Sequence, residues 1–516
     1  MSLAIKVQVC VNIKNLHVVE KMMSAQHILR VGVIGADVSA CAFVSFLKRC
    51  LPSASINIFT ESKELCHDIP LKGVSFSSSW IRNDKKGRIA VLDLGKDILG
   101  LGNKEFLVSD VKASRSFSLA SSSSRYLREF PSFSAICQNV WALGSEPFGN
   151  LIRTNSYPYN VSVHDFLSSR FGRSFAERFA NVLTRVMFAC DDAKSVPAHM
   201  AFPKLMKNCI VNGSVLLGPL FGALSSSFSL PSARMNQDVL DHLWQELMTG
   251  GKYVSMGPRL DFGEFRQALV DHVLSLPLVK VEQGGDTSGI DFGEFDILVS
   301  SKNARETFHL LDSGDVPDWA DRLSRSKSVV STRIELPEGT KIPSCQWFTD
   351  GGEKENLIGA VSPTNLFLSP SSPTEGRKSV LDVFSHKSLS DSDIAFLGIS
   401  DLDAVITCEN SESLPQFPLS YCQDMLAFNK WRLEFRKNKR RVDFQVVGKW
   451  FYAPSGSMTE TVSDASALAI KIAQRYSNFP KSIENEVSTD YINRNDRSLD
   501  CMYSSFSTPV TLHYTQ

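Results

Sequence analysis

The residues from Gly35 to Ala40 have the types and spacing of a phosphate-binding turn. In a G-x-G-x-x-G turn the first glycine makes the bend, the second lets the backbone touch a pyrophosphate, and the third lets the helix pack on the strand. This chain has Gly35, Asp37 and Ala40 at those positions, with Ala36 and Ser39 between them. Asp37 places a carboxylate beside a helix N-terminus, which attracts anions. The turn therefore predicts a dinucleotide site with an unfavourable charge in it.

The elements that must position this turn follow from the hydrophobic pattern. Residues 31–34 predict a buried strand, residues 38–48 an amphipathic helix, and residues 56–59 a second strand. Together they form a βαβ unit, which is the opening of a dinucleotide-binding domain.

The rest of the chain predicts a mixed α/β architecture. We expect helices at 162–183, 265–274, 421–435 and 463–475, strands at 89–95, 279–281, 295–300 and 444–448, alternating strands over 320–410, and a serine-rich surface loop at 114–124. Ser162 and Asp165 suit the N-terminal cap of the first of these helices. The strands at 279–281 and 295–300 follow a helix and a loop, and we assign the second of them to the nucleotide sheet.

Composition limits the classes of function. The chain has 516 residues, 43% of them hydrophobic, with 55 basic and 55 acidic side chains, so two or three globular domains are expected and a nucleic-acid partner is not. The 11 cysteines include no C-x-x-C pair and predict buried thiols rather than a metal site. The scattered histidines are expected at the surface or in packing.

Two segments leave alternatives open. Four basic residues against one acid in the first thirty residues fit a mitochondrial presequence or a plain extension. The basic run at 436–441 fits a solvated helix end, or a surface that binds carboxylates or membrane. The most apolar segment, 215–224, is interrupted by Gly218-Pro219 and allows at most peripheral membrane contact.

Four short segments occur in the order and spacing of one known family. They are His164–Gly172, Arg185–Ala189, Ala201–Leu205 and Gly213–Val215. Trp80-Ile81-Arg82 with Asp93-Leu94-Gly95, the strand at 296–300 and Leu414–Phe417 add to the pattern. On these residues the chain resembles the oxygen-dependent protoporphyrinogen oxidases, which are FAD-dependent flavoproteins of the amine-oxidase-like group.

The resemblance implies an α/β fold: an FAD/NAD(P)-binding Rossmann-like domain, a mixed β substrate domain and an inserted helical domain. Its implied boundaries are an N-terminal extension with a targeting role at 1–28, a discontinuous FAD-binding-like domain at 29–110, 250–302 and 440–478, a helical domain at 120–248, a substrate-type β domain at 303–439, and a tail at 479–516. In the family the helical domain associates with membranes.

The resemblance also implies the residues that would contact FAD. They are Gly35, Ala36, Asp37, Ser39, Ala40, Thr60, Glu61, Ser79, Trp80, Gly448 and Val462. It implies no metal and no dedicated catalytic residue. Several positions depart from the family: Thr60 stands where an acid bonds the adenosine ribose, an insertion spans about Cys66 to Ser77, and Ala465 replaces the glycine of the closing helix.

Two functions follow as hypotheses. The first is the FAD-dependent oxidation of protoporphyrinogen IX to protoporphyrin IX by oxygen in haem biosynthesis. The second is an inactive pseudoenzyme that keeps the fold as a porphyrin-binding or structural subunit. Expected partners are a porphyrinogen-type small molecule, a peripheral membrane contact, and a homodimer or protein complex, in the mitochondrion at its inner membrane.

Overall fold

A computed structural model describes part of the chain. The described residues are 28–71, 76, 90–91, 93–101, 106–109, 115–118, 127–128, 160–171, 173–201, 255–258, 263–283, 292–312, 314–337, 346–349, 356–361, 379–397, 399, 404–438, 442–451 and 458–476. The predictions for Ser79, Trp80, the apolar segment 215–224, the targeting segment and the tail lie outside these residues.

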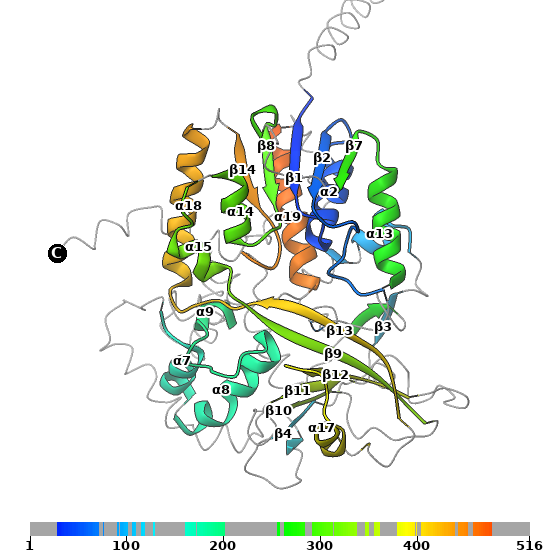
Figure 1. Ribbon diagram of the computed structural model, residues 1–516, viewed down its shortest axis with the longest axis vertical. Coiled ribbons are helices and arrows are strands. Elements are labelled where there is room, and N and C mark those ends of the chain that lie inside the picture. The colour runs from blue at the N-terminus through cyan, green and yellow to red at the C-terminus, as the bar shows by residue number, and fades with distance from the viewer. Residues whose placement is uncertain are drawn as a thin grey trace, which may run out of the picture.

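The upper part of the molecule is built on a five-stranded parallel sheet (Figure 1). Its strand order is β14 (Asp443–Val446), β8 (Ile297–Ser300), β1 (Arg30–Ile34), β2 (Ser55–Thr60), β7 (Val279–Gln283). The predicted strands at 31–34, 56–59, 279–281, 295–300 and 444–448 are thereby confirmed. The sheet thus includes strands from early and late in the chain, with β8 between β1 and β14.

Helices cover both faces of the parallel sheet because successive strand residues point to opposite sides. Ile297 and Val299 pack with one helix layer, and Leu298 between them packs with the other. The first layer contains α2 (Val38–Cys50), α13 (Gly263–Ser275) and α19 (Met458–Tyr476). The second contains α14 (Ala304–Leu311), α15 (Asp318–Leu323) and α18 (Tyr421–Asn438). This is the three-layer α/β arrangement that the sequence predicts.

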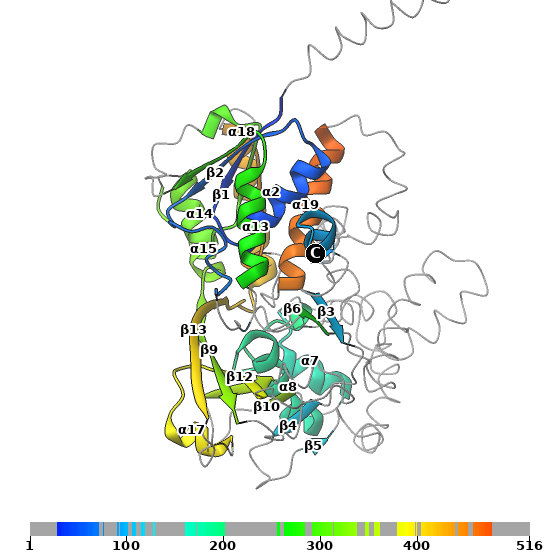
Figure 2. The ribbon, with the colours of Figure 1, turned by 90° about the vertical axis from the view of Figure 1, so that its right-hand side faces the viewer.

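A second, largely antiparallel sheet forms the lower part (Figure 2). Its order is β13 (Val405–Pro415), β9 (Ser326–Leu336), β12 (Ser379–Ser385), β11 (Leu357–Val361), β10 (Gln346–Thr349), β4 (Arg115–Ser118), β5 (Leu127–Arg128). The prediction of a loop throughout 114–124 is wrong, because β4 pairs with β10 and gives its backbone groups partners in the sheet. The short helix α17 (Asp391–Phe396) follows β12.

Three helices, α7 (Val163–Phe171), α8 (Arg173–Phe188) and α9 (Ala198–Ala201), follow one another beside this sheet, and α8 contacts its strands β10 and β11. The predicted cap is confirmed, since the Asp165 N–H donates to Ser162 Oγ at 3.0 Å. The boundaries of the proposed domains remain predictions.

The strand expected at 89–95 is wrong. Ala90 and Val91 are helical, and Asp93–Ile98 forms a π-helical turn, η1. Leu94 is fully buried in the core beneath α2, and Asp93 accepts a hydrogen bond from Arg49 at 2.5 Å. The apolar run that resembles a strand therefore serves to cover α2. The remaining short elements are η3 (Phe292–Glu294) and a two-stranded pair, β3 (Phe106–Ser109) with β6 (Ser255–Pro258).

Candidate functional site at the amino end of helix α2

The turn between β1 and α2 has the backbone of a nucleotide-binding turn. Gly35 has φ of +114°, a conformation that favours glycine, and its N–H donates to the Phe59 carbonyl at 2.9 Å. A Cβ added to Gly35 would lie 2.2 Å from Ser301 Oγ. The space beside this glycine is therefore filled by the chain's own serine.

Asp37 caps the helix that follows. Its carboxylate accepts hydrogen bonds from the Ala40 N–H at 3.0 Å and the Ser39 hydroxyl at 2.6 Å. This is the ordinary role of an N-cap aspartate, which satisfies an N–H that has no partner within the helix. The Ala40 N–H and the Ser39 hydroxyl therefore already donate to Asp37.

A second carboxylate occupies the same helix end. Asp68 Oδ1 accepts from the Val38 N–H at 2.9 Å. The loop that carries Asp68 is fixed to the turn, since the Cys66 N–H donates to the Ala36 carbonyl at 2.5 Å. Cys66 has φ of +53°, which few residues other than glycine adopt. Asp68 lies in the segment at about 66–77, where the sequence analysis expects an insertion.

The two carboxylates repel one another. Burial first, and then the charge of Asp68, raise the pKa of the Asp37 carboxyl, while the hydrogen bonds from Ser39 and Ala40 oppose the rise. A dinucleotide pyrophosphate binds this part of the fold through free N–H groups and the positive helix end. Here the N–H groups of Val38 and Ala40 already donate to the carboxylates of Asp68 and Asp37. The residues present do not fit the pyrophosphate of FAD.

The turn after β14 closes the site from the other side. Gly448 has φ of +96°, and its N–H donates to Asp464 Oδ2 at 3.0 Å. A Cβ on Gly448 would lie 2.4 Å from Ser39 Oγ. This turn therefore packs directly on the first turn of α2, and the Ser39 side chain fills the space between them.

The remaining sequence-predicted residues do not gather into a ribose or flavin site. Thr60 is buried at the end of β2, and its Oγ1 accepts from the Ser62 N–H at 3.0 Å. Glu61 is exposed, with a carboxylate oxygen 3.9 Å from Lys302 Nζ. Val462 is fully buried in the core that α2 and α19 share, so its side chain offers only apolar contact.

Lys449, which follows Gly448 in the sequence, is a cation near the turn after β14. Its ammonium donates to the Ser413 carbonyl at 3.0 Å and lies 5.9 Å from the ring centre of Trp450. It does not offset the charge of Asp37.

Sequence reasoning missed Asp68, Ser301 and Asp464, which complete the closed turn. Ser301 directly follows a predicted strand of the nucleotide sheet, so its position at the carboxyl edge could have been inferred. Asp464 lies in the closing helix, and no motif of the sequence includes it. Asp68 lies in the loop after β2, for which the sequence offers no motif or spacing rule.

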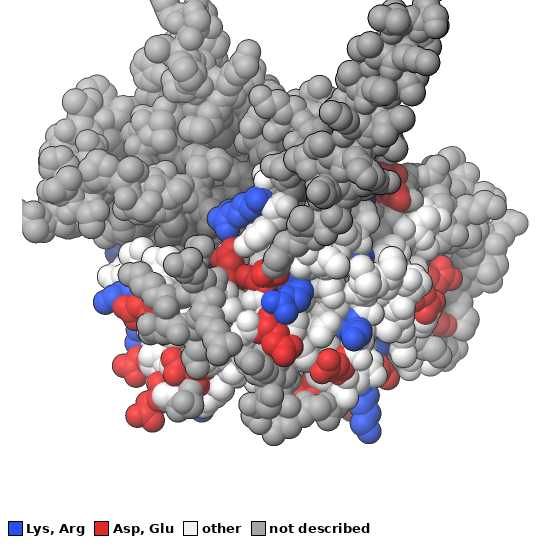
Figure 3. Space-filling view, turned by 90° about the horizontal axis from the view of Figure 1, so that it is seen from above, with Lys and Arg blue, Asp and Glu red and all other residues white. Residues whose placement is uncertain are grey.

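Other chemistry is limited in the described part of the chain. No group of three or more His, Cys, Asp or Glu side chains is placed to hold a metal ion there. The six described cysteines are all free thiols. Among the described helices, none has the length and hydropathy to cross a bilayer. On the face seen from above, basic and acidic side chains of the described residues are interspersed (Figure 3).

Comparison with known proteins identifies the fold. No protein-family profile matches the chain, and no curated protein matches its sequence. A protein provisionally assigned as a protoporphyrinogen oxidase from Exiguobacterium sp. 255-15 superposes with a TM-score of 0.58 at 11% identity, over 87% of this chain and 100% of that one. Cyclohexylamine oxidase from Brevibacterium oxydans IH-35A gives 0.53 at 11% identity, over 87% and 99%. Putrescine oxidase bound to putrescine gives 0.50 at 12% identity, over 87% and 100%. The chain therefore has the α/β fold of the amine-oxidase-like flavoproteins.

Proposed function

We propose that this chain is a catalytically inactive protein with the flavin-oxidase fold, retained as a porphyrin-binding subunit. One observation carries the loss of flavin chemistry: Asp37 and Asp68 occupy the N–H donors of Ala40 and Val38 at the amino end of α2. An anion at this end would meet two carboxylates in a buried site, which costs several kcal/mol unless a cation compensates. The porphyrin class rests on the four ordered motifs of the sequence.

The test is the visible absorbance of the purified full-length protein, before and after incubation with FAD and gel filtration. We expect a colourless protein that releases added FAD. Protoporphyrin IX added in the same way should remain bound and shift its absorption band. A flavin band near stoichiometric in the wild type would contradict the proposal.

A gain-of-function variant makes this test sharper. Asp37→Gly with Asp68→Ala removes both carboxylates and leaves the Ala40 and Val38 donors available, so FAD retention should rise at least tenfold, about 1.4 kcal/mol. The control is Asp97→Asn, which removes an exposed carboxylate of η1 elsewhere in the upper domain. Circular dichroism checks that the double variant is folded. If its FAD retention still stays at background, residues other than Asp37 and Asp68 exclude FAD.

The second candidate is an active FAD-dependent protoporphyrinogen oxidase. Gly35 and Gly448 favour it, because both keep glycine in the positive-φ turns that surround α2. Oxygen-dependent oxidation of protoporphyrinogen IX by the wild type, with peroxide produced, would select this candidate. A mitochondrial location, with inner-membrane contact and a homodimer or complex, belongs to either proposal, and fractionation of cells expressing the tagged chain tests it.

A further inference from the structure

Two buried thiols lie together where the loop after β2 meets helix α2. Cys41 lies at the end of the first turn of α2, and Cys66 lies in the loop. Both residues are 0% exposed, and both belong to the hydrophobic core that packs on α2. Both are free cysteines. The fold thus places a pair of reduced thiols at the contact between a surface loop and a core helix.

The two cysteines converge on one carbonyl group. The Cys66 N–H donates to the Ala36 carbonyl at 2.5 Å, and the Cys41 thiol approaches the same oxygen with its Sγ 4.0 Å away. The Cys66 thiol also makes a hydrogen bond with the Cys41 thiol. This bond, followed by burial, raises the pKa of Cys66 well above its usual range. The two sulfur atoms are therefore neighbours in the reduced protein.

Other contacts of the loop fix the position of Cys66 against α2. Asp68 accepts from the Val38 N–H at 2.9 Å, two residues further along the loop. Arg266 of α13 donates to the Ile69 carbonyl at 2.8 Å. Because these bonds follow Cys66 closely in the chain, they return its thiol to the same place each time the loop closes.

The loop itself covers the thiols. Leu65 and Ile69 on either side of Cys66 are buried, whereas Glu64 and His67 are exposed. The outer side of the loop therefore faces solvent, and local opening of this one segment exposes the Cys66 thiol. Opening removes both the hydrogen bond and the burial that raise the pKa of Cys66, so the reactive thiolate becomes available.

We propose that Cys41 and Cys66 are a redox modification site, at which hydrogen peroxide produces a reversible disulfide. In the open loop the Cys66 thiolate attacks the O–O bond of the peroxide. A sulfur–oxygen bond forms, giving the sulfenic acid, and the departing hydroxide takes up a proton as water. After the loop closes, the Cys41 sulfur attacks the Cys66 sulfur, and the second oxygen leaves as water with the Cys41 proton. Two thiols thus lose two electrons and one peroxide becomes two waters.

The disulfide ties the loop to α2 by a covalent bond. Asp68 then stays on the Val38 N–H, and the loop no longer opens while the bond persists. This inference goes beyond the proposed function and does not rest on it. Flavin retention is read by visible absorbance and the disulfide by peptide mass, so the failure of one proposal is seen independently of the other.

The experiment is peptide mapping of the full-length protein by mass spectrometry. The protein is treated with hydrogen peroxide, the excess is removed with catalase, and the remaining thiols are alkylated under denaturing, non-reducing conditions. We expect a linked Cys41–Cys66 peptide that dithiothreitol removes. Cys66→Ser should abolish it. Cys50→Ser is the matched control, because Cys50 is at the opposite end of α2 and its loss should leave the yield of linked peptide unchanged.

Stability gives a second readout. In urea, the equilibrium constant for unfolding should be at least tenfold smaller for the oxidised wild type than for the reduced protein, because the disulfide restricts the unfolded chain. Dithiothreitol should abolish this difference. The Cys50→Ser variant should keep it, whereas Cys41→Ser should lose it.

Three results would overturn the proposal. The first is the absence of a linked Cys41–Cys66 peptide in the folded wild type after peroxide treatment. The second is linkage of Cys66 to other cysteines at a similar yield. The third is oxidation of Cys66 to the sulfinic acid while Cys41 remains alkylated, since the closed loop would then not bring the two sulfurs together. All three are read in the wild type, so they decide the matter even where a serine variant fails to fold.

Discussion

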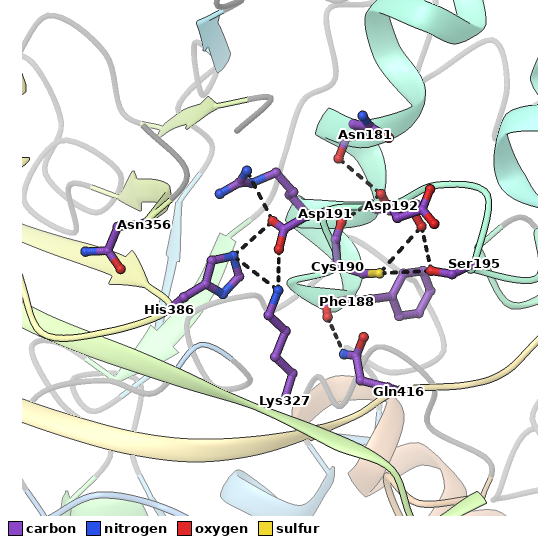
Figure 4. A network of polar contacts seen from close by, with 12 residues as sticks. Asn181, Phe188, Cys190, Asp191, Asp192, Ser195, Lys327, Asn356, His386 and Gln416 are labelled. Atoms are coloured by element: carbon purple, nitrogen blue, oxygen red, sulfur yellow. Dashed lines mark hydrogen bonds and ion pairs between the residues drawn. The ribbon is translucent and has the colours of Figure 1, made fainter. Parts of the chain in front are cut away.

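The amino end of α2 and a cluster of side chains around Asp191 hold carboxylates in different charge surroundings. At α2, Asp37 and Asp68 share one positive helix end, and burial with mutual repulsion raises the pKa of Asp37. In the cluster, one carboxylate is shared by Arg185, Lys327 and His386. The comparison shows that two carboxylates share the amino end of α2, whereas three basic groups gather around the one carboxylate of Asp191 (Figure 4).

The largest expected effect on stability comes from Asp191→Asn. It removes the negative charge that pairs with the buried Arg185, and breaking a buried pair costs about 3–5 kcal/mol. Because Asp191 is nearly half exposed, we expect a loss near the lower end, about 3 kcal/mol, in the free energy of unfolding measured with urea. A change within experimental error would show that the three basic groups do not depend on this carboxylate, and would break the comparison.

An intermediate effect on the pH dependence of stability is expected at His199, a buried core residue outside the two regions compared above. His199 is 2% exposed, and burial lowers its pKa from 6.5 to about 4. Between these values the unfolded imidazole binds a proton and the folded one does not, so stability falls as the pH decreases, with a slope of up to about 1.4 kcal/mol per pH unit.

The variant His199→Phe should remove this slope in urea unfolding measured at several pH values. His164→Phe is the control, because His164 is only part-buried and its imidazole lies 3.3 Å from the exposed Asp165 carboxylate. An unchanged slope in His199→Phe would mean that another group causes the acid sensitivity.

The smallest effect is expected from Asp37→Asn, the same chemical change made in the first region. Asparagine caps helices about as well as aspartate, so the cap is kept and the buried charge is lost. The raised pKa means that the folded state holds a proton above pH 3.8, where the unfolded state has released it, so stability falls as pH rises through that window. The variant should therefore be at least as stable as the wild type near neutral pH. A loss comparable to that of Asp191→Asn would contradict the repulsion between Asp37 and Asp68.

Much of the fold could be predicted from the sequence because its signals are local and periodic. The strand, turn and helix around Gly35 follow from a short apolar run, one glycine and a helical apolar pattern, and the cap at Ser162 follows from two side chains. The strand expected at 89–95 failed because a short apolar run does not distinguish a strand from a buried helical turn, and burial of Leu94 beneath α2 decided it.

The candidate site was predictable only in part. The position of Asp37 in the motif is enough to predict charge repulsion between its carboxylate and a bound pyrophosphate. The second carboxylate, Asp68, reaches Val38 through the fold of the loop after β2, and local patterns do not specify such a contact. The Asp191 cluster could not be foreseen, since Lys327 and His386 reach it from 136 and 195 residues away in the sequence.

The order of strands in the parallel sheet has a consequence for how the protein is made. Strand β1 lies between β2 and β8, so one of its neighbours is synthesised more than two hundred residues later, and β14 joins β8 only near the end of translation. Contacts of such sequence separation form slowly because long loops must close first. The nascent N-terminal unit therefore emerges from the ribosome with one edge of β1 unpaired, and that edge stays open to pairing with other chains until β8 is synthesised.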